Sequence, residues 1–377
     1  MKRYISIMIS VLLLFSLGVH LHAKELNIDS AVPSYILIEA QSGKVLCEKD
    51  ADLELAPASV TKVMTMLLIM EAIDNGIIDY EDTVVTSANA ASMGGSQVYL
   101  KEGEEFSVND MLKSISMASA NDACVAMAEH LSGSEEAFVE QMNQKAEELG
   151  MEHTSFENTN GLDDTVTNHY TTARDIAIMS AELIVKHPDI LKYTSVWMDT
   201  LRNGAFGLTN TNRLIRFYKG ANGLKTGSTS KAGFCISVSA YRDGMQLICV
   251  IMKAPSRDIR NESAKKLLDY GFANYSSVSF ENEILRNQKI LCSSKDNYEF
   301  TVEGYNGICA KGFSDKVEKE VKLNKKISAP LKKGDKVGTV TYTLDDEILY
   351  KGDVTVNSNV DKITYFGLLW KIIKNVF

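Results

Sequence analysis

The pattern of apolar and polar positions begins with a hairpin and a long apolar helix. Residues 34–49 predict a β-hairpin, because the apolar runs "YILIEA" and "VLCEKD" flank the polar turn "QSGK". The segment "LAPASVTKVMTMLLIM", residues 55–70, follows directly. Its length and its Met and Leu content predict a helix that becomes buried.

Four further helices are predicted downstream of this apolar run. The segment "SEEAFVEQMNQKAEELG" has apolar residues at helical spacing and stops at Gly150. "TTARDIAIMSAELIVKH" opens with threonines that can cap a helix and ends before Pro188. The other two segments, "VNDMLKSISM" and "DACVAMAEHL", are separated by "ASAN".

From about Gly223 the pattern changes to strands. Residues 233–254 contain two apolar runs around an Asp243-Gly244 turn, which strongly favours a hairpin. The segment "ESAKKLLDYGFANY" then returns to a helical period. Strands thus lie at both ends of the helical block. The sequence therefore predicts a mixed α/β (α+β) fold, in which helices flank one antiparallel sheet built from both ends of the domain.

Residues 280–357 differ from the rest of the chain. They are rich in lysine, contain segments such as "KVGTVTYTL" and "ILYKGDVTV", and show no long helical period. This pattern predicts a small β domain whose lysines lie on solvated edge strands. We therefore expect a main domain of residues 24–276, a β domain of residues 280–357 and a terminal segment of residues 360–377.

The start of the chain carries a candidate targeting segment. Residues 1–23 have the basic start, the apolar stretch and the small Ala23 that are typical of a cleavable signal peptide. The alternative is an uncleaved membrane anchor. Either reading places the bulk of the chain outside the cytoplasm.

The terminal segment, residues 360–377, predicts an amphipathic helix. Its lysines would lie towards one side, and the other side would gather Ile363, Phe366, Leu369, Trp370, Ile373 and Phe377. The segment is too short to cross a bilayer but suits a helix that lies in the bilayer interface. Packing of this helix on the protein's own core is the alternative.

Composition and charge narrow the range of functions. The formal net charge of −9 gives no indication of a nucleic-acid partner. The six cysteines form no CxxC pair and the histidines no HExxH motif, so we expect neither a metal nor another cofactor. Two disulfides are conceivable in an exported chain, and buried free thiols are the alternative.

Ser59 and Lys62 stand three residues apart at the start of the apolar helix, which places them on one face. A serine becomes a nucleophile when a base takes its proton, and burial lowers the pKa of a lysine enough for that task. The spacing recurs at Ser228–Lys231 and Ser263–Lys266. The alternative is a capping serine beside a lysine that reaches solvent. Two downstream elements favour Ser59.

The first element is "ASAND", which places Ser119 and Asn121 in the joint between two predicted helices. A hydroxyl there can relay a proton, and an amide can hold both a substrate amide and the base lysine. Ser87 and Asn89 repeat the spacing without lying in such a joint. The alternative role of Ser119 is to cap the following helix.

The second element is "GLKTGST", which contains Lys225, Thr226 and Gly227 and occurs once. It opens the strand region and therefore predicts an edge strand along a cleft. Lys225 would offer a fixed positive charge to a substrate carboxylate and to Lys62. Gly227 would let the backbone of a ligand approach closely. A simple strand-entry turn is the alternative.

In this order, the SxxK, SxN and KTG elements resemble those of the active-serine penicillin-recognising enzymes. Longer segments, among them "ASMGGSQVYLKEGE" and "NGLKTGSTSKAGFC", resemble D-alanyl-D-alanine carboxypeptidases. These are low-molecular-mass penicillin-binding proteins of the cell wall. The resemblance covers residues 30–276 strongly, and the β domain and the terminal helix in layout.

The resemblance implies a role for each residue of the first two elements. Ser59 would be the nucleophile that forms the acyl-enzyme, and Lys62 would accept its proton. Ser119 and Asn121 would form the second wall of the site, with Ser119 passing the proton on.

The resemblance also implies how the substrate is bound. Lys225 and Thr226 would bind its terminal carboxylate, and the N–H groups of Ser59 and Ser228 would form the oxyanion hole. Arg260 falls where the family keeps a carboxylate-binding arginine, with a surface arginine as the alternative.

The implied reaction removes the terminal D-alanine from a peptidoglycan stem peptide, without a cofactor, on the outer face of the cell membrane. β-Lactam antibiotics would acylate the same serine. The alternatives are a β-lactamase, a transpeptidase and a wall-binding protein without turnover. Class A β-lactamases use the glutamate of an ExxLN segment for deacylation, and none lies between Asn121 and Lys225.

Overall fold

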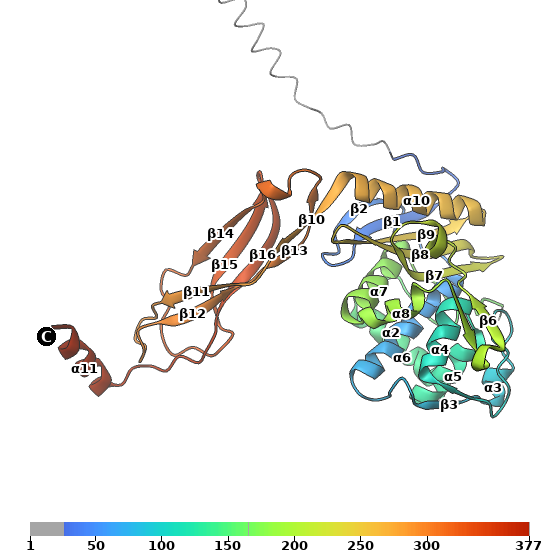
Figure 1. The fold of residues 1–377 in the computed structure, drawn as a ribbon, viewed down its shortest axis with the longest axis horizontal. Coiled ribbons are helices and arrows are strands. Elements are labelled where there is room, and N and C mark those ends of the chain that lie inside the picture. The colour runs from blue at the N-terminus through green and yellow to red at the C-terminus, as the bar shows by residue number, and fades with distance from the viewer. Residues whose placement is uncertain (1–25, 165, 377) are drawn as a thin grey trace, which may run out of the picture.

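The structure is a computed structural model that describes residues 26–164 and 166–376. Figure 1 shows an elongated molecule with a large mixed α/β part at one end, a β-rich part in the middle and a short helix at the other end. The predicted mixed α/β fold with a C-terminal β domain is confirmed. The predicted signal peptide, residues 1–23, lies outside the described residues.

A five-stranded antiparallel sheet organises the larger part. Its strand order is β2-β1-β9-β8-β7, so the N-terminal hairpin and the strands of residues 221–254 share one sheet, as predicted. The last strand in this order, β7, lies at the edge. The five strands are β1 (Ser34–Glu39), β2 (Val45–Lys49), β7 (Ala221–Thr229), β8 (Gly233–Arg242) and β9 (Met245–Ala254).

The β8–β9 hairpin follows from its turn residues. Asp243 and Gly244 both have positive φ angles, 49° and 79°, which a two-residue turn of type I′ requires. The turn sets Arg242 opposite Met245, and most residues of both strands are buried. Continuous burial fits a sheet that is covered on both faces.

Helices cover both faces of this sheet. Helix α10 (Arg257–Asn274) packs on one face, where its Leu267 and Leu268 join a core with Leu247 and Ile251 of β9. The other face carries the helical block, in which α7 (Ala173–Lys186) lies against β1 and β9. The remaining α-helices of this part are α2 (Lys62–Asp74), α3 (Ala88–Ala91), α4 (Val108–Lys113), α5 (Asn121–Ser132), α6 (Glu135–Glu148), α8 (Leu191–Thr194) and α9 (Leu214–Phe217).

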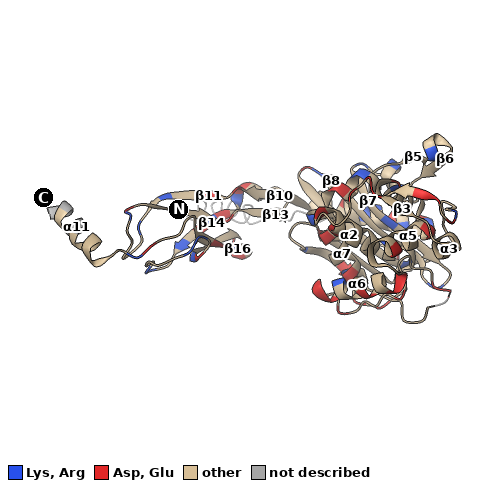
Figure 2. Cartoon of the chain, turned by 90° about the horizontal axis from the view of Figure 1, so that it is seen from below, with Lys and Arg blue, Asp and Glu red and all other residues tan. Residues whose placement is uncertain are grey.

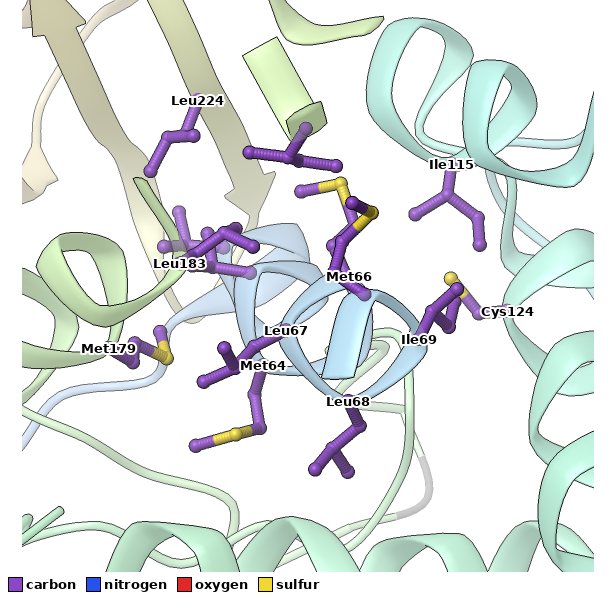
Figure 3. Packing of buried hydrophobic residues seen from close by; sticks show 14 of the residues in the cluster. Met64, Met66, Leu67, Leu68, Ile69, Ile115, Cys124, Met179, Leu183 and Leu224 are labelled. Carbon is purple, nitrogen blue, oxygen red and sulfur yellow. The ribbon is translucent and has the colours of Figure 1, made fainter. Parts of the chain in front are cut away.

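Helix α2 lies at the centre of the helical block. Its side chains fan out on several sides, with Ile69 directed towards Ile115 and Cys124 (Figure 3). Ten of its thirteen residues are buried, which explains why the sequence of this helix has no polar face. Burial of the first of them, Lys62, has consequences for the chemistry described below.

Short elements connect these helices and strands. Two small antiparallel pairs are formed by β3 (Thr83–Val85) with β4 (Glu105–Ser107), and by β5 (Met198–Leu201) with β6 (Phe206–Thr209). A 3-10 turn, η1 (Ala58–Thr61), precedes α2, and a π-helical turn, η2 (Ser114–Ala118), follows α4. Further 3-10 turns are η3 (Pro188–Ile190), η4 (Arg202–Gly204) and η5 (Ser314–Lys316).

The β-rich part consists of two antiparallel sheets. Strand β10 pairs with β13, and the second sheet has the order β11-β12-β16-β15-β14. Val278 and Tyr305 from the first sheet share a core with Phe300 and Val340 from the second. The strands are β10 (Tyr275–Phe280), β11 (Glu283–Gln288), β12 (Tyr298–Val302), β13 (Tyr305–Ala310), β14 (Glu318–Leu323), β15 (Lys336–Leu344) and β16 (Glu347–Val356).

The chain ends in helix α11 (Tyr365–Val376). Figure 2 again places this helix and the large α/β part at opposite ends of the molecule. Tyr365 and Phe366 are 77% and 79% exposed, so these two side chains are not packed on the core of the protein. Among the described residues, no helix has both the length and the hydropathy that crossing a membrane requires.

All six cysteines are described residues, and all are free thiols in the structure. Four of them, Cys124, Cys235, Cys249 and Cys309, are buried, which agrees with the buried-thiol alternative. Burial raises the pKa of Cys124 to about 12, so this thiol is unreactive although it lies close to the charged groups of the site.

Candidate active site

The structure brings the predicted site residues together around one cleft. The cleft has a volume of about 190 Å³ and lies between the edge strand β7 and the helical block. Its lining residues are Ser59, Ser96, Ser119, Thr211, Thr226, Gly227, Ser228, Arg257 and Arg260. None of these nine residues is acidic. Among the described residues, no group of three or more His, Cys, Asp or Glu side chains is placed to hold a metal ion.

Ser59 and Lys62 lie in hydrogen-bond contact at the start of α2. Ser59 is in the 3-10 turn η1 rather than in the α-helix itself, and Lys62 is the first residue of α2. The Nζ atom of Lys62 lies 3.0 Å from Ser59 Oγ. Lys62 has no exposed surface, and this burial lowers its pKa to about 8. The lysine therefore does not reach solvent.

Two carbonyl groups complete the environment of Lys62. Its Nζ donates to the side-chain Oδ1 of Asn121 at 2.7 Å and to the backbone oxygen of Asn160 at 2.7 Å. The orientation of the Asn121 amide is fixed at its other end, where Nδ2 donates to the backbone oxygen of Gly94. Asn121 thus connects Lys62 with the backbone at Gly94, two residues before Ser96 of the cleft lining.

Two of the three competing pairs have structural roles elsewhere, whereas Ser228 of the third pair lines the cleft. The Ser87 side chain caps α3 by accepting from Ala90 N, and Asn89 donates to Glu129. Ser263 is buried on α10, and the Nζ of Lys266 donates to a backbone oxygen. Neither pair lines the cleft.

Ser119 occupies a strained backbone position on the cleft. It ends the π-helical turn η2 and has φ 63° and ψ 33°, a left-handed conformation that a residue with a side chain rarely adopts. The N-cap of α5 is Ala120, so Ser119 is not the cap of that helix. π-Turns and left-handed residues concentrate at functional sites, where the fold directs a side chain against its local preference.

Strand β7 contributes Thr226 to the lining of the cleft and carries Lys225, which is buried and does not itself line the cleft. The Nζ of Lys225 donates to the backbone oxygen of Thr226 at 3.0 Å, and Thr226 Oγ1 donates to Thr211 Oγ1 at 3.0 Å. Burial, followed by the nearby charges of Lys62 and Arg260, holds the pKa of Lys225 well below its usual value. The site thus gathers several basic groups close together, and no acidic residue is among the residues that line the cleft.

Gly227 allows β7 to pass directly against η1, the 3-10 turn that contains Ser59. A Cβ atom on Gly227 would lie 2.7 Å from Pro57 O and 2.9 Å from Ser59 N. The sequence predicted that this glycine admits the backbone of a ligand. The structure shows that the close neighbour is the protein's own backbone at residues 57–60. Gly227 therefore sets the position of β7 relative to Ser59.

Arg260 is buried rather than a surface residue. Ser256 caps α10, so this helix begins five residues earlier than the sequence predicted and carries Arg260 in its first turns. The guanidinium donates to Asn261 Oδ1 and to the backbone oxygen of Cys235. Burial, with a smaller effect of the Arg257 charge, lowers its pKa to about 10, within a range where it stays protonated at neutral pH.

Several residues of the site were not predicted from the sequence. Ser96, Thr211 and Arg257 line the cleft, and Asn160 supplies a backbone oxygen that no side-chain motif can reveal. Arg257 had a detectable signal, because it precedes Arg260 by three residues on a helix and must share its face.

A buried histidine, His169, is hydrogen-bonded to η1, the 3-10 turn that contains Ser59. Ala58, just before Ser59, has a positive φ of 48°, and its carbonyl accepts from Thr61 Oγ1 at 2.9 Å. Thr61 Oγ1 lies 2.8 Å from His169 Nε2. His169 Nδ1 accepts from the N–H of Glu157, so Nε2 carries the proton and donates to Thr61. Burial lowers the pKa of His169 to about 4, which keeps this ring neutral.

Comparisons with known proteins agree with this geometry. The sequence profile of the D-alanyl-D-alanine carboxypeptidase family matches residues 21–256, and that of the penicillin-binding protein 5 C-terminal domain matches residues 283–362. The D-alanyl-D-alanine carboxypeptidase DacF of Bacillus subtilis is 42% identical over 98% of this chain and 97% of its own length.

Solved structures give the same result. Penicillin-binding protein 5 from Haemophilus influenzae has a TM-score of 0.78 and 31% identity, with 89% of this chain and 99% of that chain covered. Penicillin-binding protein D2 from Listeria monocytogenes, solved in an ampicillin-bound form, has a TM-score of 0.60 and 31% identity over 65% of this chain and 99% of its own. The match extends over the whole chain in sequence and over most of it in structure, and this protein therefore belongs to the D-alanyl-D-alanine carboxypeptidase family, a family of serine hydrolases.

Proposed function

We propose that this enzyme removes the terminal D-alanine from peptidoglycan stem peptides through an acyl-enzyme on Ser59, and that penicillins acylate the same hydroxyl. The observation that carries the proposal is the contact between Ser59 Oγ and the fully buried Nζ of Lys62, at 3.0 Å. A lysine with a pKa of about 8 is neutral in a useful fraction of molecules near neutral pH, as a general base must be.

Acylation begins when Ser59 Oγ attacks the carbonyl carbon between the two D-alanines. The hydroxyl proton moves to Lys62 Nζ as the C–O bond forms. The carbonyl oxygen becomes an oxyanion, which the N–H groups of Ser59 and Ser228 stabilise. The C–N bond then breaks, and the departing amine of D-alanine takes up a proton that Lys62 passes on through Ser119.

The positive side of the cleft recognises the substrate. Lys225 and Thr226 bind the terminal carboxylate, and Arg260 adds a second cation on the same side. The approach of this anion favours the charged form of Lys225. Lys62 can then remain the neutral member of the pair, because two adjacent buried ammonium groups disfavour each other.

Deacylation completes the cycle when water attacks the Ser59 ester and releases the shortened peptide. The cleft lining contains no glutamate or aspartate that could activate this water in the manner of a class A β-lactamase. We therefore assign the return proton transfer to Lys62 as well, since its Nζ already lies beside the ester oxygen.

The same proposal includes the cellular location. The chain acts on the outer face of the cell membrane, after removal of the leader of residues 1–23, and α11 holds it there. The exposed side chains of Tyr365, Phe366, Leu369 and Ile373 support this role, because they offer an apolar surface to a lipid interface.

The test compares wild type with Ser59→Ala for two activities, D-alanine release from a pentapeptide and labelling by a fluorescent penicillin. We expect wild type to show both and the variant to show neither, while its melting temperature stays unchanged. Labelling without D-alanine release would favour a wall-binding protein that lacks turnover. Rapid loss of the label with little peptide cleavage would favour a β-lactamase, and release that depends on an added amine would favour a transpeptidase.

A further inference from the structure

The β-rich part ends, next to α11, in three loops that are joined to one another. These loops, residues 289–296, 324–335 and 357–363, are called the distal loops here. Leu291 N donates to Ile327 O at 2.8 Å, and Leu331 N donates to Val360 O at 3.1 Å. Ile363 N donates to Cys292 O at 2.8 Å, two residues before α11 begins. The three loops therefore form one continuous surface from which the terminal helix leaves.

The distal loops carry a charge opposite to that of the whole chain. They contain seven lysines and three aspartates, which leaves a net charge of +4 in a protein whose formal charge is −9. One of the aspartates, Asp335, accepts the N–H of Lys332 and so is used within its own turn. The side chains of Lys289, Lys325, Lys326, Lys332, Lys333 and Lys362 are exposed.

The same surface exposes an apolar side chain. Leu291 exchanges backbone hydrogen bonds with Ile327 and Ala329 of the second loop, and its side chain is 57% exposed. A leucine set among lysines is the composition of a protein surface that meets the boundary between lipid headgroups and acyl chains.

We propose that the distal loops are a second membrane contact, in which their lysines bind the anionic phosphate headgroups of a lipid bilayer. This inference rests on the proposed attachment through α11. When α11 lies in the interface, Lys362 is held within about 11 Å of it, because Lys362 is only three positions before Tyr365, the first residue of α11. That distance is comparable with the Debye length of about 10 Å at 0.1 M salt, so the attraction to anionic lipid is not screened out.

A bilayer is a better match than a dissolved anion for two reasons. The lysines are spread over three loops instead of converging on one pocket, which suits a planar surface with many charges. The loops that carry them also lie at the end of the β-rich part from which α11 leaves (Figure 1), and α11 exposes Tyr365 and Phe366, so basic loops and apolar side chains are found at the same end of the molecule. The loops would fix the orientation of the β-rich part on the membrane.

The experiment measures binding of the leaderless full chain to two kinds of vesicle, phosphatidylcholine alone and phosphatidylcholine mixed with phosphatidylglycerol. The loop variant is Lys325→Gln/Lys326→Gln/Lys333→Gln. Its matched control, Lys192→Gln/Lys219→Gln/Lys351→Gln, removes three charges from exposed lysines outside the distal loops. Melting temperature and D-alanine release are measured for both, to verify that the fold is intact.

We expect the loop variant to bind the phosphatidylglycerol vesicles at least about tenfold more weakly than wild type, and the control to stay within about twofold. Both variants should bind phosphatidylcholine vesicles as wild type does. Equal binding of the loop variant and the control to the anionic vesicles would overturn the proposal.

A tail variant, Phe366→Ser/Leu369→Ser, separates this proposal from the one on which it rests. If the tail variant binds phosphatidylcholine vesicles as tightly as wild type, the attachment through α11 is wrong. The contribution of the distal loops is read independently, from the difference between the loop variant and its control on phosphatidylglycerol vesicles.

Discussion

Lys62 Nζ lies 3.0 Å from Ser59 Oγ, and its two other hydrogen-bond partners are both carbonyl oxygens. Carbonyl oxygens only accept hydrogen bonds. A neutral amine has two N–H groups and one lone pair. The two N–H groups match Asn121 Oδ1 and Asn160 O, which leaves the lone pair for the proton of Ser59. A charged ammonium would instead donate to all three oxygens, so the contacts fit both forms, and it is the burial of Lys62, which lowers its pKa to about 8, that raises the fraction of the neutral form.

This pattern predicts the effect of a charge at residue 121. Asn121→Asp keeps the shape of the side chain but sets a carboxylate beside Lys62 Nζ, which should raise the lysine pKa by about 1–3 units. We expect penicillin acylation at pH 7 to fall by about tenfold or more and to recover as the pH is raised. The matched control is Asn89→Asp, on an exposed asparagine of the competing motif. Equal acylation–pH profiles for wild type and Asn121→Asp would contradict this reading.

The buried contact between His169 and Thr61 predicts a loss of both stability and activity. His169→Ala leaves Thr61 and the N–H of Glu157 without their partner and should cost about 1–3 kcal/mol in the free energy of unfolding. Acylation should slow by about tenfold or more, because the turn that aims Ser59 loses its support. Urea unfolding and acylation kinetics test this, with His130→Ala, on an exposed histidine, as the control. If His169→Ala is as stable as wild type and is acylated at the same rate, then His169 does not support the turn that positions Ser59.

The close approach of β7 to η1 predicts that Gly227 tolerates no side chain. Gly227→Ala should destabilise the protein by about 1–3 kcal/mol, because the new Cβ meets backbone atoms that cannot move aside freely. It should also slow acylation, since β7 carries Lys225 and Thr226. Gly207→Ala on β6, where no atom lies within 4 Å of the added Cβ, is the control. Thermal melting of the two variants measures the difference, and equal melting temperatures would show that the gap between β7 and η1 adjusts easily.

The two arginines of the cleft should differ in their effect on substrate binding. Arg260 is buried beside the cleft and Arg257 is exposed. We expect Arg260→Gln to raise KM for a D-Ala-D-Ala peptide by about tenfold with kcat nearly unchanged, as loss of a charge-assisted hydrogen bond does. Arg257→Gln should raise KM by only about twofold because water screens its charge. If Arg257→Gln raises KM more than Arg260→Gln does, then Arg257 is the residue that binds the substrate carboxylate.

Local patterns made much of this architecture predictable. The Asp243-Gly244 turn determines its hairpin from two residues, and "GLKTGST" lies on the edge strand that its place in the chain suggested. Periodicity found α6 and α7 because each buries one face and has a recognisable cap, Ser134 and Thr172. Such features depend on neighbours within a few residues, which a single sequence displays directly.

The details of the candidate site depend on contacts between distant segments. Ser59 was expected on an α-helix, but it lies in a 3-10 turn whose preceding residue, Ala58, is left-handed. That turn is held by His169, more than a hundred residues away, and by Gly161, whose added Cβ would collide with Ala58 O. The contacts of His169 and Gly161 with this turn join segments that are far apart in the sequence, so no local sequence pattern predicts them. The roles of Ser119 and Lys225 in the reaction stay predictions.

The central claim is that a buried, neutral Lys62 takes the proton of Ser59, and the pH dependence of penicillin acylation tests it most directly. The pKa of Lys62 is lowered to about 8, so the amine is charged below that pH and neutral above it. The second-order rate constant of the wild-type enzyme should therefore rise about tenfold per pH unit up to about pH 8 and then level off. A rate constant that stays flat from about pH 6 to 9 would contradict the claim, because a group that titrates near 8 would then have no part in the step.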